Sequence, residues 1–181
     1  MCKINFKKTL PYIGSILFMI ILSYIYFSPD ILEGKVLFQG DTQQGIAIGQ
    51  EGKAFREATG ETTRWTNSLF SGMPNFQISP SYANNYWMGQ IGRIYHLGLQ
   101  SPASLVFIMM LGFFILLSAM KIRWYLALVG AIAYAFSSYF FIIIGAGHIW
   151  KFITLAYIPP TIAGIILAYR GKYIGGAALI G

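Results

Sequence analysis

Four long apolar segments separated by polar ones dominate the chain. They cover residues 10–27, 104–120, 124–144 and 152–169, and none of them contains Asp, Glu, Lys or Arg. At a rise of about 1.5 Å per residue, each would form a helix roughly 26–32 Å long, close to the ~30 Å thickness of the hydrocarbon layer of a bilayer. The pattern therefore predicts four membrane-spanning helices.

The apolar pattern resumes at the end of the chain. Residues 173–181 are too few to cross a bilayer, so we expect them to begin a further, truncated span and the chain to be the N-terminal piece of a longer protein. Within the fourth segment, Pro159 and Pro160 remove backbone hydrogen bonds. We therefore expect the helix over residues 152–169 to be kinked.

The segment between the first two predicted spans, residues 28–103, is polar and contains all six acidic residues of the chain. Residues 42–58 and 82–97 space their apolar side chains as one face of a helix would. We expect two amphipathic helices that lie on the membrane surface. The sequence between them is rich in Gly, Pro, Ser, Thr and Asn, which predicts an irregular conformation.

The composition agrees with a membrane protein. Hydrophobic residues make up 56% of the chain and charged residues only 10%, whereas a soluble domain carries about 25% charged residues. We therefore predict an all-α, polytopic membrane protein. The single cysteine, Cys2, lies at the N-terminus, so the long polar segment contains no disulfide.

The basic residues predict how the chain is oriented. Residues 1–9, 121–123 and 170–172 carry seven Lys and Arg and no acidic residue. The positive-inside rule places these segments in the cytoplasm, with residues 28–103 and the short loop 145–151 outside. Because the basic residues flank spans and form no patch with interleaved aromatics, we expect no nucleic-acid partner.

Asp41 is the first candidate for chemistry. In one interpretation it is the N-cap of a helix, with Gln44 reaching back three residues later, a cap worth about 1 kcal/mol. In the other, its carboxylate lies at the membrane surface and accepts a proton from a hydroxyl that attacks a lipid-linked substrate. The two roles are compatible.

His148 and Lys151 are candidates for binding a phosphate. They lie in "GAGHIWKF", a short outer loop in which Gly145 and Gly147 would allow a close approach of the backbone. Alternatively, Lys151 extends to the membrane surface and His148 only lies at the interface. Both residues share the predicted outer side with Asp41, which favours the functional interpretation.

A third candidate is the stretch "RWTNSLFSGMP". Trp65 could stack on a sugar ring, while Arg64 and Asn67 supply hydrogen-bond donors. Alternatively, Trp65 and Phe70 anchor a loop in the membrane interface.

Three stretches resemble a known family in their order and spacing: "SPDILEGKVLFQGDTQQG", "REATGETTRWTNSLFSGMPNFQIS" and "YAFSSYFFIIIGAGHIWKFITLAYIPPTIAGIILAYRGKY". They are similar to the N-terminal part of YfhO family proteins of the type found in Bacteroidetes. These are multi-span bacterial membrane proteins similar to lipid-carrier-dependent glycosyltransferases of the GT-C architecture. The resemblance covers nearly the whole chain, which is a minor fraction of a family member.

The resemblance implies a GT-C-like N-terminal helical bundle in the inner (plasma) membrane. Such an enzyme transfers a sugar, with inversion, from a polyprenyl-phosphate donor to a hydroxyl on a cell-envelope polymer or lipid at the external face. Asp41 matches the catalytic carboxylate, and His148 and Lys151 would stabilise the departing lipid phosphate. The long loop lacks a paired D-x-D, so no divalent metal is expected.

Two other interpretations are open. The chain could be part of a transporter or flippase for a lipid-linked envelope precursor, with Asp41 only capping a helix. It could also be an inactive fragment, because spans that complete a donor groove are missing. A transporter is expected to carry ionisable residues within its spans, and the four apolar segments have no acid or base.

Overall fold

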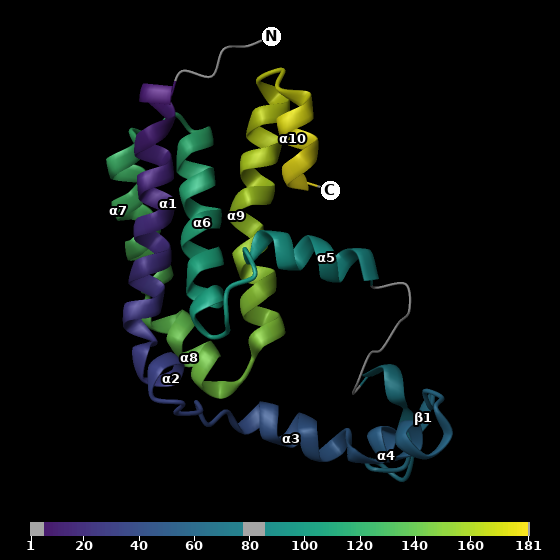
Figure 1. The fold of residues 1–181 in the computed structure, drawn as a ribbon. Coiled ribbons are helices and arrows are strands. Elements are labelled where there is room, and N and C mark those ends of the chain that lie inside the picture. Colours follow the sequence, from purple (N-terminus) through teal and green to yellow (C-terminus); the bar gives the residue numbers. More distant parts are fainter. Residues whose placement is uncertain (1–5, 78–85, 181) are drawn as a thin grey trace.

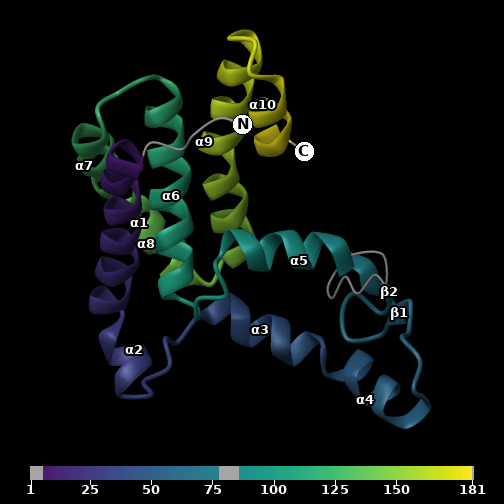
Figure 2. The same ribbon diagram turned by 45° about the horizontal axis from the view of Figure 1, so that its top comes forward.

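The computed structural model describes residues 6–77 and 86–180. This part of the chain is mostly helical and contains one small antiparallel sheet. Long helices stand side by side as a bundle. The described residues 28–77 and 86–102, here named the projecting segment, extend to one side of it (Figures 1 and 2).

Helix α6, Ala103–Ala119, lies at the centre of the bundle. Its residues 103–110 are all buried, and it is apolar on every side, as a central helix has to be. Helices α1 and α7 pack against α6 and against each other, α9 packs against α6, and α10 packs on α9 (Figure 1). Their bounds are Phe6–Tyr26 (α1), Trp124–Ala135 (α7), Ile149–Tyr169 (α9) and Tyr173–Ile180 (α10).

Two helices in the described residues are long and apolar enough to cross a membrane. They are α1, through Thr9–Tyr26, and α9. A third span results if α7 and α8 (Ser138–Ala146) are counted as one broken span. The predicted span 104–120 corresponds to α6, which at 17 residues is shorter than the other two.

The prediction of one continuous helix over residues 124–144 is wrong. The segment forms α7 and α8, which are bent by 46° relative to each other. Phe136 and Phe141 both contact Tyr26 at the end of α1, with ring centroids 5.3 and 4.9 Å from the tyrosine ring. Residues five apart on a straight helix point about 140° away from each other, so the break is what brings both rings to Tyr26.

Small residues allow α6 and α9 to approach closely. A Cβ on Gly112 would lie 2.7 Å from the Ala156 carbonyl oxygen and 3.0 Å from Pro160 Cδ. Pro160 has no N–H to donate to that carbonyl, so the Ala156 carbonyl oxygen lacks its usual helical hydrogen bond. Helix α6 packs against this oxygen at Gly112. Helix α9 continues as one helix through Pro159 and Pro160. The kink expected there stays a prediction.

Residues 173–181 were expected to begin a further span, and α10 occupies Tyr173–Ile180. It packs on α9 through two glycines. A Cβ on Gly164 would lie 2.8 Å from the Gly176 carbonyl oxygen, and a Cβ on Gly176 would lie 2.9 Å from the Gly164 carbonyl oxygen. The two backbones therefore touch, which is the packing that small residues give to helices in membranes.

The projecting segment is only partly regular. The predicted helix over residues 42–58 is two helices that meet at Gly49, a residue type with low helix propensity. The predicted helix over 82–97 ends two residues earlier than expected, at Tyr95, and residues 82–85 lie outside the described residues. The elements are α2 (Ser28–Leu32), α3 (Gly40–Ile48), α4 (Gln50–Thr59), β1 (Trp65–Thr66), β2 (Met73–Pro74), η1 (Asn75–Gln77) and α5 (Tyr86–Tyr95).

Helix α5 is fixed to the bundle by Tyr95. The ring stacks on Tyr157 of α9 at 4.8 Å between centroids, and its hydroxyl donates to the Ile108 carbonyl oxygen of α6 at 3.3 Å. Burial raises the pKa of Tyr95, with a smaller contribution from Tyr157. Ile91 and Ile94 stay exposed, so α5 keeps an apolar surface beside its anchored end.

Candidate functional site

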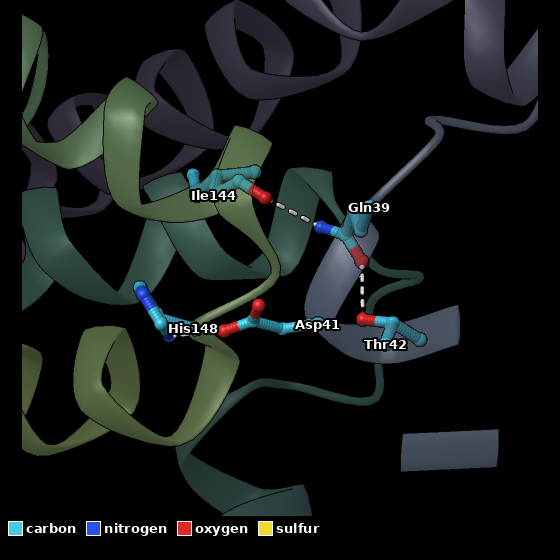
Figure 3. A network of polar contacts seen from close by, with 5 residues as sticks. All are labelled: Gln39, Asp41, Thr42, Ile144 and His148. Atoms are coloured by element: carbon cyan, nitrogen blue, oxygen red, sulfur yellow. Dashed lines mark hydrogen bonds and ion pairs between the residues drawn. The ribbon is translucent and has the colours of Figure 1, made fainter. Parts of the chain in front are cut away.

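The start of α3 is attached to the turn between α8 and α9, although the two are about a hundred residues apart in sequence. Gln39, the residue before α3, donates from Nε2 to the Ile144 carbonyl oxygen at 2.6 Å. Thr42 Oγ1 donates to Gln39 Oε1 at 3.0 Å, which holds the amide in this orientation (Figure 3). One side chain of the projecting segment thus adds a hydrogen bond to a carbonyl near the end of a bundle helix.

Gly147 makes this close approach possible. It follows α8 with φ +93°, and the amides of Gly147 and His148 bond back to the carbonyls of Ile144 and Ile143. This pairing is the Schellman motif that ends many helices, and it favours glycine. A Cβ at Gly147 would lie 3.0 Å from Thr42 Oγ1 and 3.1 Å from Thr42 N. The absence of a Cβ at Gly147 therefore allows the start of α3 to pack against this turn.

Asp41 and His148 are in direct contact at this junction, and the contact becomes an ion pair when His148 is protonated. Asp41 Oδ2 lies 2.8 Å from His148 Nδ1, and the two side chains are 48% and 50% exposed. The carboxylate points toward the imidazole (Figure 3). Helix α3 supplies one partner and the residue before α9 supplies the other. The pair is open to solvent on one side and held by the backbone contacts on the other.

The prediction that Asp41 is the N-cap of a helix is wrong. Helix α3 begins at Gly40, its N-cap is Gln39, and no side chain caps it. Asp41 lies within the first turn, where a negative charge is favourable next to the free amides. Because its side chain is not needed for the cap, the carboxylate is available to His148.

Lys151 does not share the contact with Asp41. It lies in the first turn of α9, and its Nζ is 5.7 Å from the centroid of the Tyr139 ring on α8. Among the residues that the structure describes, Lys151 makes no ion pair. Of the two predicted phosphate ligands, the structure brings only His148 against Asp41, while Lys151 stays exposed nearby along the chain.

Asn67 and its neighbours form a second polar cluster around Glu51 of α4. The Glu51 carboxylate accepts from Thr66 Oγ1 at 2.6 Å, from the Asn67 amide at 2.8 Å and from Ser68 Oγ at 2.9 Å. Asn67 Nδ2 adds a fourth contact at 3.3 Å. Asn67 therefore ties β1 to α4, with both its backbone N–H and its Nδ2 directed at Glu51.

Trp65 covers the turn of the β1–β2 hairpin. The ring packs so closely on the turn that a Cβ added to Gly72 would lie 2.8 Å from Trp65 Nε1. Trp65 Nε1 also donates a hydrogen bond to Asn67 Oδ1 at 3.3 Å. Trp65 is still 53% exposed, and Arg64 is exposed beside it. Across the described ranges, no hydrogen bond or ion pair joins this cluster to Asp41 or His148.

The hydrogen bonds to Glu51 shift its titration. Donation from Thr66 above all, then from Ser68 and Asn67, stabilises the charged carboxylate and lowers the pKa of Glu51 from 4.5 to about 2. A lowered pKa in the folded protein stabilises the cluster at pH values above 4.5. This stabilisation is lost as the pH falls through about 2.

We expect the amide signal of Asn67 to report this titration. Its chemical shift should change with a midpoint near pH 2, because that amide donates to Glu51. In Glu51→Gln the change should disappear and residues 65–68 should lose their fixed conformation. Glu57→Gln is the matched control, since Glu57 is exposed and, among the residues that the structure describes, its carboxylate pairs with Lys53 alone, at 3.8 Å. A midpoint near 4.5 in the unaltered protein would show that the cluster does not form.

An open apolar groove of about 300 Å³ lies between α1 and α2. No predicted site residue lines it. Its lining residues are Ile20, Ile21, Tyr24, Ile25, Ser28, Ile31 and Leu32.

Gln39, Thr42 and Glu51 are not predictable as site residues from the sequence, because hydrogen bonds between distant segments leave no local pattern. Gly147 was predicted to allow a close backbone approach, but to a phosphate. No three His, Cys, Asp or Glu residues in the described part of the chain are arranged to hold a metal ion. No family model matches the chain, and comparisons with curated proteins and with solved structures also find no match.

Proposed function

We propose that the protein is a membrane glycosyltransferase of the GT-C type. It would transfer a sugar from a polyprenyl-phosphate donor to a hydroxyl of a cell-envelope polymer or lipid, with inversion. The observation that carries this proposal is the Asp41–His148 pair, a half-exposed carboxylate and imidazole 2.8 Å apart at one end of the bundle. Such a pair can take up the proton that the attacking hydroxyl releases.

The position of the pair supports a lipid-linked substrate. It lies at the end of the bundle where α2 and the α8–α9 turn are found, away from the start of α1 (Figure 1). The linker before α3 exposes Val36 and Phe38, which are 87% and 78% exposed and suited to contact with lipid. A donor confined to the bilayer would meet the pair at this surface, which lowers the entropy cost of bringing the two together.

The distribution of charge supports an external site. Lys7, Lys121, Arg123, Arg170 and Lys172 belong to the segments that the positive-inside rule places in the cytoplasm. Arg170 donates to the Ala119 carbonyl oxygen and so joins the ends of α9 and α6 on that side. The Asp41–His148 pair would then face the outside of the cell.

The other predicted residues take separate roles in this proposal. Because Asp41 compensates any charge on His148, Lys151 is the better candidate for the departing phosphate, helped by the amides at the start of α9. Trp65 and Arg64 remain exposed for a saccharide, while Asn67 is held by Glu51.

One observation favours a transporter or flippase instead. The α7–α8 pair is a broken helix, and discontinuous spanning helices form the binding sites of many transporters. Against this, α6, α7 and α8 contain no Asp, Glu, Lys, Arg or His that could line a pathway.

The two functions are separated by reconstituting the protein in liposomes with a labelled polyprenyl-phosphate sugar and an envelope-polymer acceptor. The proposal predicts label on the acceptor and release of unglycosylated polyprenyl phosphate. Movement of intact donor across the bilayer without transfer would support the flippase. If neither transfer nor movement occurs with any of a panel of donors, the proposed function is wrong.

A further inference from the structure

We infer that His148, rather than Asp41, is the group that accepts the proton during transfer, and that Asp41 acts as its positioning residue. This inference rests on the proposed function and deepens it. It is based on the orientation of the His148 ring, in which Nδ1 faces the Asp41 carboxylate and Nε2 is left free.

The geometry fixes the form of the imidazole. An ionised carboxylate only accepts hydrogen bonds, so Nδ1, 2.8 Å from Asp41 Oδ2, has to carry a proton. In neutral His148 the lone pair is then on Nε2. Within the described residues, Nε2 has no hydrogen-bond partner, and the side chain is 50% exposed. A basic nitrogen is thus presented toward solvent or substrate.

The surroundings hold this arrangement in place. Gln39 and Thr42 fix the start of α3 against the α8–α9 turn, and Gly147 sets the direction of the chain immediately before His148. The charged group in contact with the imidazole is Asp41. Lys151, three residues along the chain, is directed to Tyr139. The carboxylate therefore both orients His148 and stabilises the imidazolium that proton uptake creates.

The reaction step balances without a metal or another reactant. The acceptor hydroxyl oxygen forms a bond to the anomeric carbon of the sugar. The bond from that carbon to the phosphate oxygen breaks, and its electron pair leaves with the polyprenyl phosphate. The hydroxyl proton moves to His148 Nε2, and the imidazolium later releases it to water.

The first test does not depend on activity. The chain has only two histidines, His96 and His148, so ¹⁵N spectra of His-labelled protein in the His96→Gln background report His148 alone. We expect the neutral imidazole to be protonated at Nδ1, and we expect Asp41→Asn to shift the population toward the Nε2-protonated form. Protonation at Nε2 in the unaltered protein would overturn the inference, whether or not transfer is detected.

The second test is rescue of activity. His148→Ala should lower the transfer rate at least about 100-fold, the lower end of what a general base contributes. Added imidazole should restore part of the rate in His148→Ala but not in the double variant with Asp41→Asn, because Asp41 would orient the free imidazole. His96→Ala is the control and should leave the rate unchanged.

The outcomes separate the two proposals. Transfer that is unaffected by His148→Ala, or a loss that imidazole does not restore, would overturn the role of His148 while leaving the transferase standing. Absence of transfer in the unaltered protein would overturn both.

Discussion

Asparagine in place of Asp41 is expected to lower the rate of sugar transfer by at least about 100-fold. The amide carries no negative charge, so it does not stabilise an imidazolium at His148. It can also donate from its NH₂ group to Nδ1, which would favour the wrong tautomer. Measured at saturating donor, the loss should appear in the turnover rate rather than in the apparent affinity, because the carboxylate acts on proton transfer.

Asp30→Asn is the matched control for this experiment. Asp30 is the only other aspartate of the chain and lies in the first turn of α2, in the same projecting segment. Its replacement should leave the rate within about twofold. Equal rates for Asp41→Asn and the unaltered protein would exclude the Asp41–His148 pair from the chemistry, and a loss in both variants would point to a general effect of charge in this segment.

Gly147→Ala is expected to detach α3 from the bundle. Gly147 has φ +93°, where an alanine costs roughly 1–2 kcal/mol, and the new Cβ would be 3.0 Å from Thr42 Oγ1. We expect amide hydrogen exchange in residues 39–48 to increase about tenfold, which corresponds to ~1.4 kcal/mol. Transfer should fall with it, because Asp41 moves away from His148.

Gly145→Ala provides the control for this change. Gly145 lies two residues earlier in α8, and a Cβ there would meet no atom within 4 Å. Exchange in residues 39–48 should be unaltered in that variant. The same exchange for both alanine variants would show that contact with Thr42 does not hold α3 in place.

Much of the fold follows from the distribution of apolar residues, since the helices α1, α6 and α9 start and end close to the predicted spans. The break between α7 and α8 does not follow from it. Ser137 and Ser138 interrupt the apolar run only weakly, and the bend depends on how Phe136 and Phe141 pack on Tyr26. Contacts between distant segments decide such details, and a single sequence does not record them.

The candidate site is likewise predictable from the sequence only in part. The sequence predicts both Asp41 and His148 as site residues, from their residue types and their shared side of the membrane, and the structure brings them into contact. The sequence predicts Asp41 as the N-cap wrongly because the helix starts two residues earlier than expected, at Gly40. Helix boundaries depend on which backbone carbonyls and amides find partners, and here the Gln43 amide donates to the Gln39 carbonyl oxygen, which makes Gln39 the N-cap.

The contact between Asp41 and His148 is the observation on which the proposed chemistry depends, and it is measured most directly by solid-state NMR in lipid. In the His96→Gln, Asp30→Asn background, ¹⁵N-histidine and ¹³Cγ-aspartate labels mark only His148 and Asp41. The 2.8 Å separation of Nδ1 and Oδ2 predicts strong dipolar dephasing between the labelled nitrogen and carbon. Absence of dephasing would mean that the two side chains do not meet, and would contradict the account.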